Sequence, residues 1–136
     1  MKKNKGFSLV ELIVVVAIMA VLVGILAPAY LSYVEKTRRG ADEDMAEEVR
    51  HSVEVAAAEI CVYDEIVNLP SWSFTKGNAI STKFTQTNLQ ASMADVYAGK
   101  NFDIKSKYYS GKTYTITVTA PNGTTGAALV ITGAWS

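Results

Sequence analysis

One acidic side chain, Glu11, stands inside a long apolar run near the N-terminus, GFSLVELIVVVAIMAVLVGILAPAYL, which covers residues 6–31. Three lysines come just before this run, at Lys2, Lys3 and Lys5. A carboxylate in a membrane-spanning helix costs roughly 3 kcal/mol near the bilayer centre and less near the interface. This carboxylate therefore needs a function that offsets its cost, and Glu11 is the first candidate functional residue.

The rest of the sequence offers little that could do catalytic or metal chemistry. His51 is the only histidine, and no nucleophile is spaced to meet it, so we expect a solvent-exposed helix residue. Cys61 is the only cysteine, which excludes an intramolecular disulfide, and its apolar-rich surroundings predict a buried structural thiol. Asp95 and Asp103 are too few carboxylates for a dedicated calcium site. We expect no enzyme activity, no metal and no cofactor.

The formal net charge of zero hides an uneven distribution of charge along the chain. Residues 35–65 carry ten acidic and four basic side chains, whereas residues 66–136 carry six lysines and two aspartates. Because Trp72, Tyr108 and Tyr109 lie among these lysines, a nucleic-acid-binding surface is one interpretation. Scattered lysines that keep the domain soluble are the favoured interpretation.

The element that must position Glu11 is the apolar run itself. A helix rises about 1.5 Å per residue, so residues 7–30 would span roughly 36 Å, which is enough to cross a ~30 Å hydrocarbon core. A secretory signal peptide cut at Ala27-Pro28-Ala29 is disfavoured, because the run is too long and a proline lies inside the site. A plain transmembrane anchor explains the length of the run but not its carboxylate.

A third interpretation rests on the junction KNKGFSLVE, residues 3–11. This junction resembles the class III signal of type IV pilins and the related pseudopilins. The similarity continues along the run, since Pro28 falls where family helices bend, and Tyr30 and Tyr33 fall where the family often carries tyrosines. Beyond Val34 the resemblance is one of architecture only.

The resemblance implies that a prepilin peptidase cuts between Gly6 and Phe7 on the cytoplasmic side and N-methylates Phe7. A small residue at Gly6 would leave the cut unhindered. Glu11 takes the place of the family's near-invariant glutamate, whose carboxylate meets the N-terminal amine of a neighbouring subunit in a filament, and pairing relieves the cost of both charges. Gly24 and Pro28 are then either a tolerated membrane-helix kink or a segment that bends on assembly.

Over residues 34–62 the apolar side chains recur at intervals of three, four or seven, which predicts an amphipathic continuation of the same helix. The expected buried stripe consists of Val34, Ala41, Met45, Val49, Val53, Ala56 and Ile60. Glu47, Arg50 and Glu54 are spaced for ion pairs along this helix. Residues 68–71 contain Asn, Pro and Ser and predict its end.

The remaining residues predict a small head made mostly of strands. Residues 72–74 alternate aromatic and polar side chains and could start a strand, and residues 89–97 predict a short helix with Thr87 or Asn88 as its cap. Further strands are predicted over residues 102–109, 113–119 and 127–134, with a turn at residues 121–126. An antiparallel sheet laid on the helix stripe is the expected result.

The predicted fold class is therefore α+β. A long N-terminal helix, transmembrane in its first half and amphipathic in its second, packs on an antiparallel sheet of three or four strands. The predicted parts are a cleaved leader (residues 1–6), a transmembrane and filament-core helix (residues 7–33), its amphipathic continuation (residues 34–67) and a β-rich head (residues 68–136).

The predicted function is that of a structural subunit of a type IV pilus-like filament. A pseudopilin of a type II secretion or competence system is the alternative within the family, and a membrane-anchored binding module, for instance for DNA, is the alternative of another class. The implied partners are other copies of the chain, a prepilin peptidase, a membrane assembly platform and minor pilins. We expect a single-pass membrane precursor and then a cell-surface filament, in which a basic head could attract the acidic residues 42–59 of a neighbour.

Overall fold

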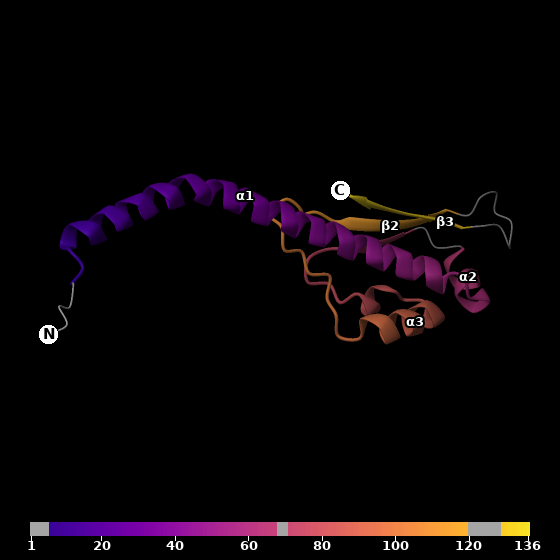
Figure 1. The fold of residues 1–136 in the computed structure, drawn as a ribbon. Coiled ribbons are helices and arrows are strands. Elements are labelled where there is room, and N and C mark those ends of the chain that lie inside the picture. Colours follow the sequence, from indigo (N-terminus) through magenta and orange to yellow (C-terminus); the bar gives the residue numbers. More distant parts are fainter. Residues whose placement is uncertain (1–5, 68–70, 120–128) are drawn as a thin grey trace. The chain divides into compact units, whose positions relative to one another are not determined.

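The computed structural model describes residues 6–67, 71–119 and 129–136 (Figure 1). Its elements, in chain order, are α1 (Leu9–Ala56), α2 (Ile60–Ile66), β1 (Ser71–Phe74), the short 3-10 helix η1 (Ser81–Lys83), α3 (Thr87–Tyr97), β2 (Tyr114–Thr119) and β3 (Val130–Trp135). The chain forms two compact units, Met1–Thr37 and Arg38–Ser136.

The described part of the first unit is helical from Leu9 onward, and its apolar side chains are exposed on every face. By length and composition α1 is able to cross a membrane. The helix continues through Pro28, which has no N–H to donate to the carbonyl of Gly24. This unit buries almost nothing by itself, so its apolar surface needs a lipid or protein environment.

In the second unit, one face of α1 packs into the core beside a three-stranded antiparallel sheet of order β1-β2-β3. Residue pairs such as Trp72 with Ile116 join β1 to β2, and Val118 with Ile131 join β2 to β3. The alternation Tyr114, Ile116, Val118 is buried as expected. This arrangement confirms the predicted α+β class and reduces the predicted three or four strands to three in the described residues.

The buried stripe of α1 differs from the predicted one at its start. Val49, Val53 and Ala56 are buried as expected, but the next positions toward the N-terminus are Ala46 and Asp42. The expected Ala41 is exposed and Met45 is only partly buried. The predicted and the observed stripe both have a spacing of three or four residues. A pattern of apolar residues alone could not identify the observed stripe, because one of its members is an aspartate.

The predicted single helix to about Val62 is wrong in its last part. At the end of α1 the hydrogen bonds join residues three apart: Ala58 N donates to Val55 O and Glu59 N to Ala56 O (both 3.1 Å). Glu59 then adopts an extended conformation before α2 begins. The new direction buries Val62 and leaves Cys61 exposed. The prediction of a buried thiol at Cys61 is therefore also wrong.

The predicted strand over residues 102–109 is wrong as well. The alternation on which it rested is real, because Phe102, Ile104 and Ser106 are buried between exposed neighbours. The segment does not join the sheet, whose strand order is β1-β2-β3. Phe102 N donates to Asn78 O (2.7 Å), and the chain then turns before β2.

The other predicted elements of the head are present. β1 contains the predicted residues 72–74, and α3 covers the predicted short helix, although neither Thr87 nor Asn88 is its cap. Glu65 of α2 replaces the cap, because its carboxylate accepts hydrogen bonds from Asn88 N and Leu89 N. The turn at residues 121–126, the first residues of the predicted last strand and most of the predicted helix stop at 68–71 lie outside the described residues.

Candidate functional site

Ser8 and Glu11 form a reciprocal cap at the start of α1. Ser8 N donates to Glu11 Oε2 (2.8 Å), and Val10 N donates to Ser8 Oγ (3.3 Å). The first N–H groups of a helix have no partner within it, and a Ser or Thr followed three residues later by Glu satisfies two of them. Glu11 therefore has a hydrogen-bond donor within its own chain, which lowers the cost of a carboxylate in this apolar segment.

Gly6 and Phe7 lie outside the helix, just before this cap, and both are exposed. The Phe7 side chain is 93% exposed. A Cβ added to Gly6 would meet nothing within 4 Å. The fold of the chain itself therefore makes no demand for glycine at this position, so any demand for a small residue has to come from a protein that binds the peptide bond between Gly6 and Phe7.

The predicted helix weak points are both inside α1. Gly24 has open space where a Cβ would stand, so its smallness serves no packing within the chain. The apolar run ends at Leu31, and the next residue, Ser32, donates a hydrogen bond from its Oγ to Ala29 O (2.8 Å). Bending at Gly24 and Pro28 during assembly stays a prediction.

The residues with nucleophilic or metal-binding potential do not converge. His51 is exposed, as predicted, and its Nδ1 lies 3.2 Å from Glu54 Oε2. Ser52 Oγ instead bonds Tyr97 Oη (2.8 Å), so Ser52, His51 and Glu54 form no relay. Within residues 6–67, 71–119 and 129–136, no three His, Cys, Asp or Glu side chains are grouped to hold a metal ion.

Asp42 is a structural residue that the sequence pattern did not reveal. Its carboxylate is buried, with 1% exposure, and its Oδ1 and Oδ2 accept hydrogen bonds from the backbone of Lys105 and Ser106 (both 2.8 Å). Charged acceptors of backbone N–H groups make strong hydrogen bonds. The signal that could have found it is its position, four residues before Ala46 and seven before Val49 on the buried face.

A second missed feature is a cluster of aromatic and basic side chains near Asp42. The Arg39 guanidinium and the Lys112 ammonium each lie 4.2 Å from the centre of the Tyr108 ring. Tyr109 stacks on Trp135 with ring centres 4.1 Å apart, and burial raises the pKa of its hydroxyl. Adjacent tyrosines among lysines were visible in the sequence, but the arginine from α1 was not expected beside them.

Acid should weaken this part of the head through Glu43. A hydrogen bond from Tyr109 Oη (2.5 Å) lowers the pKa of the Glu43 carboxyl below its ordinary 4.5, and Arg39 Nε (3.0 Å) lowers it further. A carboxyl with a lowered folded-state pKa stabilises the fold above its ordinary pKa, and that contribution disappears as pH falls through the lowered value. Between pH ~6 and pH ~3 the melting temperature should therefore fall less in Tyr109→Phe than in the wild type.

The measurement is thermal unfolding of the full chain in detergent at both pH values. Tyr97→Phe is the matched control, because Tyr97 Oη bonds Ser52 rather than Glu43. The control should keep the wild-type pH dependence. Equal pH dependence in wild type and Tyr109→Phe would show that the hydrogen bond to Glu43 has no effect on acid stability.

Comparison with known proteins places these observations in a family. Residues 1–27 match the family model described as the prokaryotic N-terminal methylation motif. The chain is 31% identical, over 101 residues, to "Prepilin peptidase-dependent protein A" of Clostridium perfringens (strain 13 / Type A), with 70% of this chain and 71% of that protein covered. No solved structure matches significantly. The chain therefore belongs to the type IV pilin-like family, whose members are structural rather than catalytic proteins.

Proposed function

We propose that the chain is made as a membrane precursor, cut between Gly6 and Phe7 by a prepilin peptidase, N-methylated on Phe7 and assembled into a filament. The prepilin-type signal supports the first step, and the name of the Clostridium relative records dependence on that peptidase. Gly6 is exposed and lies outside the helix, which leaves the bond accessible. In this proposal residues 1–6 are the cytoplasmic leader and residues 7–33 form the membrane span and later the filament core.

The observation that carries the proposal is Glu11 beside an N-terminus that cleavage would create. Before cleavage the Ser8 N–H gives the carboxylate a neutral partner. After cleavage the Phe7 amine is positive and four residues away, in the same apolar layer as Glu11 of a neighbouring copy. Two charges in a low-dielectric layer cost free energy unless they meet, so the pair penalises subunits out of register.

The apolar faces of residues 9–31 supply the attraction between subunits, because each face is exposed in the single chain. Other copies, the membrane assembly platform and minor pilins are the proposed partners, and the cell surface is the proposed final location. A pseudopilin of a secretion or competence system is the alternative within the family and would use the same residues. A membrane-anchored DNA-binding module is the competing function.

A bulky residue at position 6 should stop this sequence of events. We expect Gly6→Val to leave the chain membrane-bound and at full precursor length, with filaments reduced to background, because the fold tolerates a Cβ there and only the peptidase would be obstructed. Immunoblots of membrane and sheared-surface fractions measure both effects. Gly24→Ala, at another glycine with open space around it, should still be processed. Processing of Gly6→Val at the wild-type rate would contradict the proposal.

A further inference from the structure

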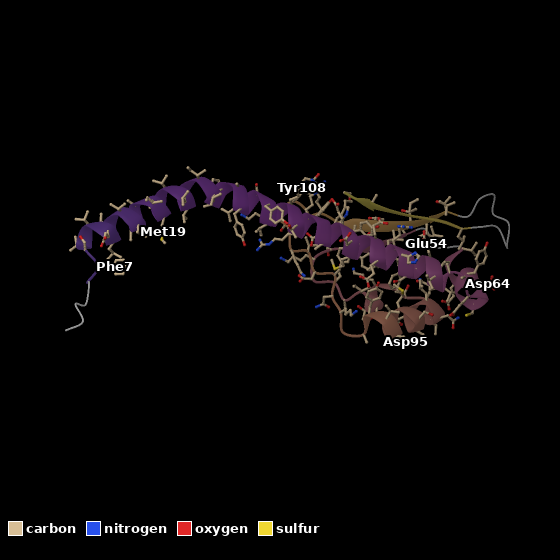
Figure 2. All side chains as sticks on the ribbon, viewed as in Figure 1. Phe7, Met19, Glu54, Asp64, Asp95 and Tyr108 are labelled. Carbon is tan, nitrogen blue, oxygen red and sulfur yellow. The ribbon has the colours of Figure 1, made fainter. Side chains whose placement is uncertain are left out.

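Two segments of the second unit carry net charges of opposite sign, and the basic one lies against Asp42 and Glu43 of α1. Residues 100–112 carry four lysines and one aspartate, whereas residues 51–75 carry four acidic side chains and no lysine or arginine. Figure 2 shows Tyr108, from the first segment, and Asp64, from the second, at opposite ends of this unit. In a chain that stacks end to end, such a separation gives an attraction at each junction.

The basic end is held in place by the contacts around Asp42. The buried carboxylate fixes the backbone at Lys105 and Ser106, and the cation–aromatic contacts fix Tyr108 between α1 and the following turn. Tyr108 remains 49% exposed. We call Arg39, Lys105, Tyr108 and Lys112 the basic loop surface. Because its backbone is already ordered, a partner that binds it pays little additional conformational entropy.

A groove at the ends of α1 and α3 has exposed apolar and acidic side chains. A groove of about 200 Å³ lies between the last turns of α1 and α3. Val55 and Val96 face it and are 60% and 51% exposed. Glu59 and His51 also line it, and Asp95, next to Val96 in the sequence, is exposed but does not line it. We call Val55, Glu59 and Val96, together with the neighbouring Asp95, the acidic groove.

Neither acidic residue of this groove belongs to the ion pairs of the described residues. Those pairs join Arg39, Arg50 and His51 to Glu43, Glu47 and Glu54. The groove therefore combines exposed apolar surface with carboxylates outside the ion pairs of the described residues, and His51, which is paired with Glu54, also lines it. A basic surface with an aromatic side chain at its centre fits both properties.

We propose that the basic loop surface of one copy docks on the acidic groove of the next copy along the filament. This inference rests on the proposed filament function. The two surfaces differ and lie apart on the chain, so the contact is head-to-tail and propagates instead of closing into a dimer. Two acidic residues of α1 contact this region in the same chain: Glu43 is paired with Arg39 and Tyr109, and Asp42 accepts the backbone N–H groups of Lys105 and Ser106. Within the described residues, neither forms an ion pair with the Lys105 or Lys112 side chain, so both lysines can reach the neighbour.

A charge exchange tests the contact. Lys105→Glu with Lys112→Glu should lower the yield of sheared filaments about tenfold, as should Glu59→Lys with Asp95→Lys, because each puts like charges across the junction. The four substitutions together should restore the yield to within about threefold of wild type. Lys76→Glu with Lys83→Glu, outside the basic loop surface, is the matched control and should assemble normally.

Disulfide trapping tests the geometry independently. In a Cys61→Ser background, Val96→Cys with Tyr108→Cys should give ladders of cross-linked chains in intact filaments, while either cysteine alone should give none. Val96→Cys with Thr117→Cys, at an exposed position on the sheet, is the control for random collision.

The outcomes separate this inference from the proposed function. If wild-type cells make no filaments from this chain, the proposed function fails. If wild type assembles but the fourfold variant assembles no better than either pair, or ladders are absent, the docking contact is wrong. If Lys105→Glu with Lys112→Glu assembles normally but loses binding to DNA or to vesicles of anionic lipid, the basic loop surface serves that ligand and the proposal is overturned.

Discussion

Replacing Glu11 with glutamine is expected to leave the chain processed and inserted in the membrane but to reduce the filament yield at least about tenfold, since an unpaired charge in a buried pair costs several kcal/mol. Glutamine keeps an oxygen that accepts the Ser8 N–H, so the cap at the start of α1 survives. Only the negative charge disappears. The Phe7 amine of the neighbouring subunit then has no anion in the apolar layer.

Two further variants separate charge from capping. Ser8→Ala removes the hydroxyl that accepts the Val10 N–H and keeps the Glu11 carboxylate, so it should cost about 1 kcal/mol of helix stability and leave assembly largely intact. Glu11→Ala removes both the negative charge and the acceptor of the Ser8 N–H, and it should assemble no better than Glu11→Gln. Immunoblots of sheared filaments and of processed chain in membranes measure these effects. Wild-type filament yield from Glu11→Gln would mean that the carboxylate acts only as a helix cap.

Replacing Asp42 with alanine is expected to destabilise the head by about 2–4 kcal/mol, because it leaves the backbone N–H groups of Lys105 and Ser106 without partners in a buried site. Asp42→Asn keeps one acceptor oxygen and should fall between alanine and wild type. Because the loop at residues 105–112 is tied to α1 through this carboxylate, the basic loop surface should lose its order before the rest of the head.

Denaturation of the full chain in detergent, followed by the fluorescence of Trp72 and Trp135, both of which pack in the head, measures this loss. Asp44→Ala is the matched control, since Asp44 lies on the same helix with an exposed side chain and should change stability by less than about 0.5 kcal/mol. If Asp42→Ala unfolds at the same denaturant concentration as Asp44→Ala, the buried carboxylate contributes nothing to the fold.

The sequence was sufficient to predict the long helix, the antiparallel sheet and most of the short elements, because each rests on a local periodicity. The alternation Tyr114, Ile116, Val118 predicts a half-buried strand, and β2 is that strand. The segment 102–109 has the same alternation but joins no strand of the sheet, and Phe102 N bonds Asn78 O instead. The choice of a strand's partner depends on the whole fold and not on the local alternation. The break after Ala56, which exposes Cys61, likewise carries no Gly or Pro signal in the sequence.

In the candidate site, too, contacts between residues close in sequence could be predicted and contacts between distant residues could not. Ser8 and Glu11 are three residues apart, so their capping contact could be read from spacing alone, although only the carboxylate was singled out. Asp42 meets its partners 63 and 64 residues later in the chain. A pattern based on apolar residues assigns an aspartate to the solvent face and cannot find such a distant contact. The Arg39–Tyr108 contact is equally distant in sequence.

The most direct test of the account is the mass of the N-terminal peptide of the chain. The chain is isolated from its own cells in two fractions, membranes and sheared filaments. We predict a peptide that begins at Phe7 and carries one additional methyl group on its amine. An N-terminus at Met1 in both fractions would contradict processing, and one at Tyr30 would show that the apolar run is a signal peptide removed by a different enzyme.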